Sequence, residues 1–239
     1  MERKQPVLGI IQLDSVHAIE GSSAELLDRG DVMPFLIADP SLWHLPFQSV
    51  IARGADSVAN KVPTPEAVSG IIGAASRLDS QVQLIIGGCG YMWASRKHLY
   101  GRTSTAALTS GLEFLSLALR MTNKPVGIIT WDATSLVSML EDHPGSERFR
   151  FVSVGDLTEW SNAWTCRSAY QKPGGWTKER MAQQFAEQLA EAFADDGVFK
   201  DVGVLVIECM LVPDFRETIR TVTSLPVLDL IYFAKAALE

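Results

Sequence analysis

Two cysteines are the residues best suited to chemistry in this 239-residue chain. Cys89 and Cys209 closely follow short apolar runs, Val82–Gly87 and Val202–Ile207. A thiol has a pKa near ~8.5, which neighbours or a helix N-terminus can lower, so cysteine can act as base or acid near neutral pH. Proton exchange at a stereocentre needs a base on one face and an acid on the other. Two thiols facing one carbon would supply both groups.

The apolar runs before the two cysteines are expected to be buried strands. Each cysteine is followed by an expected helix, and then by Lys124-Pro125-Val126 or Leu225-Pro226-Val227, which opens the next strand. Strands alternating with helices predict mostly parallel sheets. The repeated unit therefore predicts an α/β protein made of two related halves. Ligands bind beyond the carboxyl ends of strands in such folds, where both thiols would lie.

The remaining elements follow from periodicity and from capping residues. Strands are expected at 7–13, 126–130 and 227–230, and helices at 64–78, 106–121, 177–194 and 214–222. Segments 14–62 and 143–176 are broken repeatedly by turn-forming residues, so we expect loops and short elements in the first segment and loops in the second. The expected division is 1–121 for the first half, with the C-terminal segment 226–239 packing back on it, and 122–225 for the second half.

Composition narrows the classes of function. Hydrophobic residues make up 47% and charged residues 21% of the chain, close to globular averages. The net charge of −7 disfavours nucleic acid as a partner. No apolar stretch is long enough to span a bilayer, and Met1–Pro6 does not begin a signal peptide, so we expect a cytoplasmic protein without a membrane partner. The three cysteines form no CxxC pair and no zinc pattern with histidine, and Cys166 is expected to be structural.

Four segments together give a more specific indication: GGCG after a strand, KPVGIIT, VLVIEC and LPVLDL. The chain resembles the aspartate/glutamate racemase superfamily, which includes glutamate, aspartate and hydantoin racemases, maleate isomerases and arylmalonate decarboxylases. The resemblance covers most of the chain from Val7. It implies two pseudo-symmetric α/β halves with the active site in the cleft between them, and Cys89 and Cys209 as the acid/base pair. It also implies catalysis without pyridoxal phosphate, metal or another cofactor.

Five further residues are candidates for substrate binding. Asp14 resembles an aspartate that helps to orient the nearby cysteine in glutamate racemases, although it suits an ordinary turn equally well. Thr130 ends a strand and either donates to a substrate carboxylate or caps the following turn. Gly90, Tyr91 and Met210 follow the two cysteines, where backbone N–H groups at helix starts can hold a carboxylate and developing enolate charge. We therefore expect a small-molecule carboxylate as the substrate and a homo-oligomer, dimer or higher, as the assembly.

The chain departs from the glutamate racemase pattern after both cysteines. Gly90-Tyr91 and Met210-Leu211 stand where that pattern has Asn-Thr or Ser-type residues and Thr-His. These departures predict a substrate with one anion and a group bulkier and less polar than that of glutamate. Tyr91 and Trp131 would line its site, or else pack in the core. The substrate anion would pair with one of three arginines: Arg53, Arg96 or Arg216.

Two other functions remain open at this point. Decarboxylases of the superfamily have one active-site cysteine, matching Cys209, so the presence of Cys89 argues against that activity. Maleate isomerases have both, with one acting as nucleophile, so cis–trans isomerisation is the main alternative. A small-ligand-binding protein without turnover is the third reading. Glu208, next to Cys209, should face the other side of the strand and form an ion pair or a backbone contact.

Overall fold

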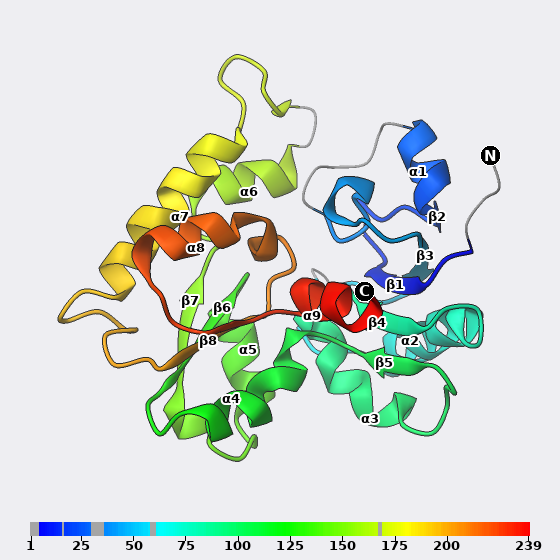
Figure 1. Ribbon diagram of the computed structural model, residues 1–239, viewed down its shortest axis with the longest axis horizontal. Helices are drawn as coiled ribbons and strands as arrows, with labels where there is room; N and C mark the ends of the chain where they lie inside the picture. Colours follow the sequence, from blue (N-terminus) through cyan, green and yellow to red (C-terminus); the bar gives the residue numbers. More distant parts are fainter. Residues whose placement is uncertain (1–4, 16, 30–35, 58–60, 167–168) are drawn as a thin grey trace. The chain divides into compact units, whose positions relative to one another are not determined.

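The computed structural model describes residues 5–15, 17–29, 36–57, 61–166 and 169–239 (Figure 1). The chain divides into two compact units. Unit 1 comprises Met1–Glu113 and Leu230–Glu239, and unit 2 comprises Phe114–Asp229. Each unit is built on its own mostly parallel sheet with helices around it, which confirms the predicted α/β class. No helix in the described ranges is both long and apolar enough to span a membrane.

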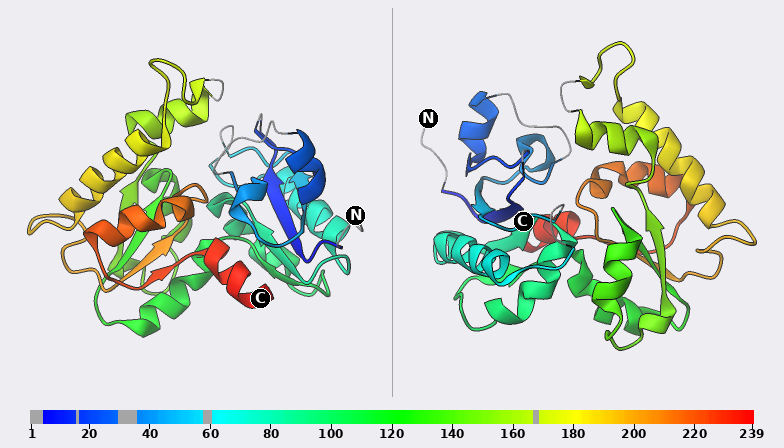
Figure 2. Two further views of the ribbon diagram at one scale, coloured as in Figure 1. Left: turned by 45° about the horizontal axis from the view of Figure 1, so that its top comes forward. Right: turned by 180° about the vertical axis from the view of Figure 1, so that it is seen from behind.

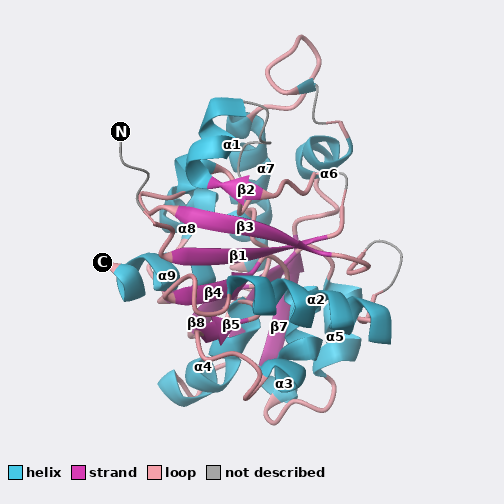
Figure 3. Cartoon of the chain, turned by 90° about the vertical axis from the view of Figure 1, so that its right-hand side faces the viewer, coloured by secondary structure: helices cyan, strands magenta, loops and turns pink. Residues whose placement is uncertain are grey.

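Unit 1 is organised around a sheet with the strand order β2-β3-β1-β4-β5, and Figure 3 shows β2, β3, β1 and β4 following one another in this order. All neighbours are parallel except β2 and β3. The strands are β1 (Leu8–Leu13), β2 (Gly21–Ser22), β3 (Phe47–Ala52), β4 (Leu84–Gly87) and β5 (Ala106–Leu108). The helices are α1 (Ser23–Arg29), α2 (Pro65–Leu78), α3 (Arg96–Leu99) and α9 (Leu230–Leu238), with 3-10 turns η1 (Pro40–Leu42), η2 (Gly90–Ser95) and η3 (Gly111–Phe114).

Helix α2 shows how the sequence builds this unit. Thr64 caps its start, because the side-chain oxygen accepts a hydrogen bond from the Ala67 N–H at 3.2 Å, and Pro65 occupies the first turn. Its buried face, which includes Ile71 and Leu78, packs against β3 and β1. Gly70 lies so close to the turn after β3 that an added Cβ would be 1.9 Å from the Arg53 carbonyl oxygen. The close approach of the helix to this turn therefore requires glycine here.

Unit 2 contains a fully parallel sheet with the strand order β7-β6-β8-β9. The strands are β6 (Val126–Thr130), β7 (Phe149–Ser153), β8 (Val204–Ile207) and β9 (Val227–Leu228). The helices are α4 (Leu115–Met121), α5 (Ala133–Leu140), α6 (Thr158–Thr165), α7 (Lys178–Ala192) and α8 (Arg216–Val222), with 3-10 turns η4 (Ser146–Arg148) and η6 (Val212–Phe215). Helices α7 and α8 lie side by side (Figure 2).

Three fully buried aromatic side chains join the helices of unit 2. Trp160 of α6 packs edge-to-face on Phe185 of α7, with ring centroids 5.5 Å apart, and at a tilt on Phe215 of η6, with centroids 4.7 Å apart. The Trp160 indole N–H donates to the Met181 carbonyl at 3.1 Å, so its polar atom is paired as well. This cluster fixes α6, α7 and η6 as one packed layer of the unit.

The division of the chain differs from the expected one at both ends of unit 2. The expected boundary at 121/122 would leave α4 in the first unit, but α4 packs on β8 and β6 and lies in unit 2. Segment 226–239 divides at residue 230. Strand β9 pairs with β8 in unit 2, whereas α9 packs on β4 in unit 1.

The two units share one strand order. In unit 1, β1 is flanked by β3 on one side and by β4 and then β5 on the other; in unit 2, β6 is flanked by β7 and by β8 and then β9. Strands β1, β3, β4 and β5 of unit 1 therefore correspond, in chain order, to β6, β7, β8 and β9 of unit 2. Unit 1 adds β2 at one edge. The repeat that the sequence indicated is therefore a repeat of topology.

Candidate functional site

The two cysteines occupy matching positions in the two units. Ile11 pairs with Gly87 at the end of β4, and Ile129 pairs with Ile207 at the end of β8. Cys89 lies two residues beyond Gly87, and Cys209 lies two residues beyond Ile207. Both thiols are thus placed at the carboxyl end of the equivalent strand, the edge of parallel sheets where ligands bind.

The hydrogen bonds around the cysteines repeat as well. The N–H group before each cysteine donates to the central strand: Gly88 to the Ile11 carbonyl at 2.8 Å, and Glu208 to the Ile129 carbonyl at 2.9 Å. The cysteine carbonyl then accepts from the N–H three residues later, at 3.0 Å for Cys89 and 3.1 Å for Cys209. The local backbone that positions each thiol is therefore the same construction used twice.

Cys89 is half-buried and opens the turn η2. It packs against the core cluster that contains Tyr91 and Met92, with Leu13 of β1 against the same cluster. Gly90 and Tyr91, both predicted to bind substrate, are buried in this turn. Burial raises the pKa of Tyr91, and negative charge on Asp56 or Cys89 raises it further, whereas the Thr64 main chain opposes these effects. The phenol therefore stays protonated at neutral pH.

Cys209 is 6% exposed, and Met210 and Leu211 after it are equally buried. The residue before it, Glu208, is a buried acid whose carboxylate accepts a hydrogen bond of 2.6 Å from the Thr130 hydroxyl. A separation this short is typical of a hydroxyl donating to an ionised carboxylate. The Thr130 hydroxyl has a single proton, which it donates to Glu208. Thr130 can therefore donate to a substrate only if its hydrogen bond to Glu208 breaks.

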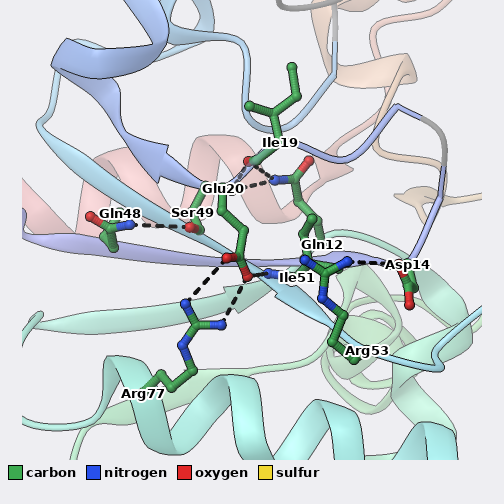
Figure 4. A network of polar contacts seen from close by, with 9 residues as sticks. All are labelled: Gln12, Asp14, Ile19, Glu20, Gln48, Ser49, Ile51, Arg53 and Arg77. Carbon is green, nitrogen blue, oxygen red and sulfur yellow. Dashed lines mark hydrogen bonds and ion pairs between the residues drawn. The ribbon is translucent and has the colours of Figure 1, made fainter.

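Asp14 connects the end of β1 to the turn after β3 (Figure 4). Its carboxylate accepts from the Gly54 N–H at 2.9 Å and pairs with the exposed Arg53 guanidinium at 3.3 Å. Gly54 has a φ of +78°, a conformation that glycine adopts readily, so the aspartate stabilises a tight turn. These contacts agree with the turn role that the sequence allowed for Asp14. Its role in orienting Cys89 stays a prediction.

Polar contacts fasten the segment after β1 to the sheet in the same view (Figure 4). The buried Gln12 amide donates to the Ile19 carbonyl at 2.6 Å and to the Ser49 hydroxyl. The Glu20 carboxylate receives the Arg77 guanidinium at 2.9 Å. The hydrogen bond from Arg77 is the main reason why the pKa of Glu20 lies below its ordinary value. This network ties the loop at the carboxyl end of β1 to β3 and α2.

An aromatic pair lies at the corresponding edge of unit 2. Trp131, directly after β6, packs on Trp164 of α6 with ring centroids 5.7 Å apart, and both are half-buried. A Cβ on Gly155 would be 2.9 Å from two atoms of the Trp131 indole, so the glycine makes room for the ring. Trp164 was not predicted because its helix was expected to be a loop. The spacing of Trp160, Ala163 and Trp164 is the helical signal that would have indicated it.

The aspartate after Trp131 caps the next helix. Asp132 accepts from the backbone N–H of Thr134 at 2.9 Å and from that of Ser135, at the start of α5. Burial raises the pKa of Asp132, but hydrogen bonds from Ser135 and Thr134 outweigh burial and hold the pKa below its ordinary value. Asp132 occupies the position of Asp14 in the repeat, and both carboxylates organise the turn beyond the central strand.

The three arginines considered for the substrate anion already have protein partners. Arg53 pairs with Asp14, and Arg96 stacks 3.4 Å above the Trp93 ring. Arg216 pairs with the buried Asp229 at 2.5 Å. Among the described residues, no group of three or more histidine, cysteine or acidic side chains is arranged to hold a metal ion.

The fold and these strand ends define a class of protein: two parallel-sheet α/β units, each with a cysteine just beyond the same strand. Comparison with known proteins gives no matching family profile and no curated relative. Among solved structures the chain is similar to a Picrophilus torridus aspartate racemase. The two are 14% identical, the match covers 98% of this chain and 92% of that chain, and the TM-score is 0.49. At that identity and TM-score the likeness supports no inference about activity.

Proposed function

We propose that the protein is a cofactor-independent racemase or epimerase that acts on a carboxylate-bearing carbon acid by proton transfer between two thiols. One cysteine takes the proton from the substrate carbon as thiolate, and the other returns a proton to the opposite face as thiol. Cys89 and Cys209 hold these two roles, which exchange when the substrate enantiomer changes.

The observation that carries the proposal is the matched placement of the two cysteines. Each cysteine lies two residues beyond the end of the equivalent strand, β4 in unit 1 and β8 in unit 2. The backbone hydrogen bonds around the two cysteines are also the same, although the neighbouring side chains differ. A buried cysteine by itself is usually a small packing residue. Two that recur at the ligand-binding edge of topologically equivalent units support a shared chemical task.

The aromatic pair of unit 2 supports a bulky substrate group. Trp131 and Trp164 are half-buried beyond the end of β6, which also carries Thr130. Apolar and aromatic ligand groups bind well against such rings. We infer that the substrate carries a carboxylate or an equivalent anion together with an aromatic or large apolar group.

Hydrogen–deuterium exchange in deuterated water tests the reaction without knowledge of the natural substrate. Single enantiomers of glutamate, aspartate, phenylalanine and a 5-benzyl hydantoin are incubated with the protein, and α-deuterium and chirality are measured together. Maleate is included, since its conversion to fumarate would indicate cis–trans isomerisation instead. We expect exchange with racemisation for a substrate that has an aromatic group.

Cysteine variants then assign the thiols. Cys89→Ser and Cys209→Ser should each lower racemisation at least about 100-fold, since a hydroxyl is a far weaker base than a thiolate. Each variant can still exchange the α-proton of one enantiomer, because one thiol remains. Cys166→Ser, at the exposed end of α6, is the matched control and should keep full activity. Unchanged racemisation in either of the first two variants would remove that cysteine from the mechanism.

A further inference from the structure

The turn after α3 carries a highly exposed tyrosine. Residues 99–102 form a type II turn, because Tyr100 has φ −59° and ψ 123° and Gly101 has φ +72°. The Arg102 N–H closes the turn on the Leu99 carbonyl at 3.0 Å. Tyr100 is 69% exposed, and a Cβ on Gly101 would meet nothing within 4 Å. The tip of the turn is therefore surrounded by solvent, and its aromatic ring contributes little to the core of unit 1.

Cations accompany this tyrosine. Lys97 and Arg102 are exposed, and neither makes an ion pair with any residue in the part of the chain that the structure describes. The sequence from 80 to 112 contains no aspartate or glutamate. In a protein with a net charge of −7, residues 97–102 thus form a positive surface with an aromatic centre. We refer to this segment as the Tyr100 turn.

Unit 2 contains a hollow of the opposite charge. It has a volume of about 390 Å³ and lies between β7 and the last turns of α7. Val152, Ala192 and Val198 provide an apolar lining, and Val198 is 46% exposed. Asp156 and Glu191 line the same hollow, and within the described ranges neither carboxylate has a cationic partner. The β7–α7 hollow therefore combines apolar surface with uncompensated negative charge.

The outer edge of β7 adds a hydrogen-bond acceptor to this hollow. Strand β7 is an edge strand of its sheet. Its outward carbonyl at Phe149 accepts from Arg150 at 2.9 Å, and that at Ser153 accepts from Gln188 at 2.7 Å. Phe151 lies midway between them, so its carbonyl faces the same way, and Phe151 lines the hollow. Carbonyl and carboxylate oxygens suit lysine and arginine, whose side chains only donate.

We propose that the Tyr100 turn of one copy of the chain binds in the β7–α7 hollow of a second copy. The tyrosine ring packs on the apolar lining, and the two cations of the turn pair with the two carboxylates of the hollow. A second copy is the partner because the chain itself carries both surfaces, which complement each other in charge and in apolar character. Tyrosine and arginine are also the residues that most often dominate binding energy at protein interfaces.

The proposed contact joins two unlike surfaces. Two copies form a closed dimer if each turn binds the other copy's hollow, and a ring or open chain results if they do not. In either case, every copy uses one turn and one hollow. The inference concerns assembly, so it stands or falls independently of the proposed racemisation.

Two complementary variants test the contact, with mass measured by light scattering after size-exclusion chromatography. The turn variant, Tyr100→Ser with Arg102→Glu, keeps its hollow intact. The hollow variant, Glu191→Lys with Val198→Asp, keeps its turn intact. Leu27→Ser on α1, where the leucine is 66% exposed, is the matched control for loss of an exposed apolar side chain. Circular dichroism and urea unfolding establish that every variant is folded.

Wild type and Leu27→Ser should form the same assembly at roughly 100 μM. Each double variant should weaken self-association at least about 100-fold and elute as a monomer, since it removes an anchor residue and reverses a charge. An equimolar mixture of the two double variants should form a 1:1 heterodimer, because one intact turn and one intact hollow meet in it.

Three results would overturn the inference: a monomeric wild type, double variants that assemble as wild type does, or a mixture that stays monomeric. The mixture is the decisive measurement, since a variant that had merely lost stability would not recover binding when combined with the other.

Discussion

The hydrogen bond between Thr130 and Glu208 allows a quantitative prediction close to Cys209. Thr130→Val keeps the shape of the side chain and removes the hydroxyl that donates to the Glu208 carboxylate at 2.6 Å. The two residues are 2% and 5% exposed, so water does not readily replace the lost donor. The variant therefore leaves a buried acid short of one hydrogen bond.

The expected loss of stability follows from that arrangement. A hydrogen bond to a charged group contributes roughly 1.5–3 kcal/mol, so Thr130→Val should lower the free energy of unfolding by about 2 kcal/mol. Thr130→Ser keeps the hydroxyl and should lose less than about 1 kcal/mol, mainly through the missing methyl group. In a double-mutant cycle that combines Thr130→Val with Glu208→Gln, the coupling energy between the two residues should be about 1.5 kcal/mol.

Urea unfolding followed by tryptophan fluorescence measures these free energies. Four of the six tryptophans lie in unit 2, where Thr130 is: Trp131, Trp160, Trp164 and Trp176. The slope of free energy against urea must be the same in all variants for the comparison to hold. A Thr130→Val variant whose free energy of unfolding lies within about 0.5 kcal/mol of wild type would refute the argument that this hydrogen bond is buried and stabilising. A change that small is typical of a substitution at the surface.

Two further predictions concern unit 1. Gly70→Ala should destabilise the protein by more than about 2 kcal/mol in urea unfolding, because its Cβ would be 1.9 Å from the Arg53 carbonyl oxygen. In the same helix, a Cβ on Gly73 would meet nothing within 4 Å, so the control Gly73→Ala should stabilise the protein by about 0.5–1 kcal/mol. Equal effects of the two substitutions would contradict the predicted backbone clash. Arg77→Gln should lower stability more at pH 7 than near pH 3, as urea unfolding at both pH values will show. The pKa of Glu20 is lowered in the folded state, so its contribution is present above the ordinary carboxyl pKa and is lost as the pH falls through the lowered value; a loss that is the same at both pH values would argue against the pairing.

The elements around the cysteines were predictable because their signals are local. Strand β6 has the predicted bounds, and α2 and α7 begin after the threonine caps that the sequence indicated. The expected long helix at 106–121 is wrong. Ala106–Leu108 pairs with β4 as a strand, and only Leu115–Met121 forms an α-helix there. Three residues at a sheet edge form a strand because of their partner, which no local pattern shows.

The segment at 143–176 was expected to be loop but contains β7 and α6. Helix α6 is rich in Trp, Ser, Asn and Thr, which are weak helix formers, and it depends on the burial of Trp160 against α7 and η6. The bond between Thr130 and Glu208 joins residues 78 positions apart through the register of β6 and β8. Contacts of this kind follow from tertiary packing, so the strands that precede the cysteines could be predicted from local signals, whereas the hydrogen bond between Thr130 and Glu208 could not.

The shared topology of the two units also bears on how such a chain can evolve. Two identical halves, as in a symmetric dimer of one short gene product, would surround both thiols with the same side chains. A single chain carrying both halves is released from that identity, since each copy can accumulate its own substitutions. Tyr91 and Leu211, or Gly88 and Glu208, differ at positions where the backbone agrees. Two copies within one chain therefore allow the backbone around the two cysteines to stay the same while the side chains next to each cysteine diverge.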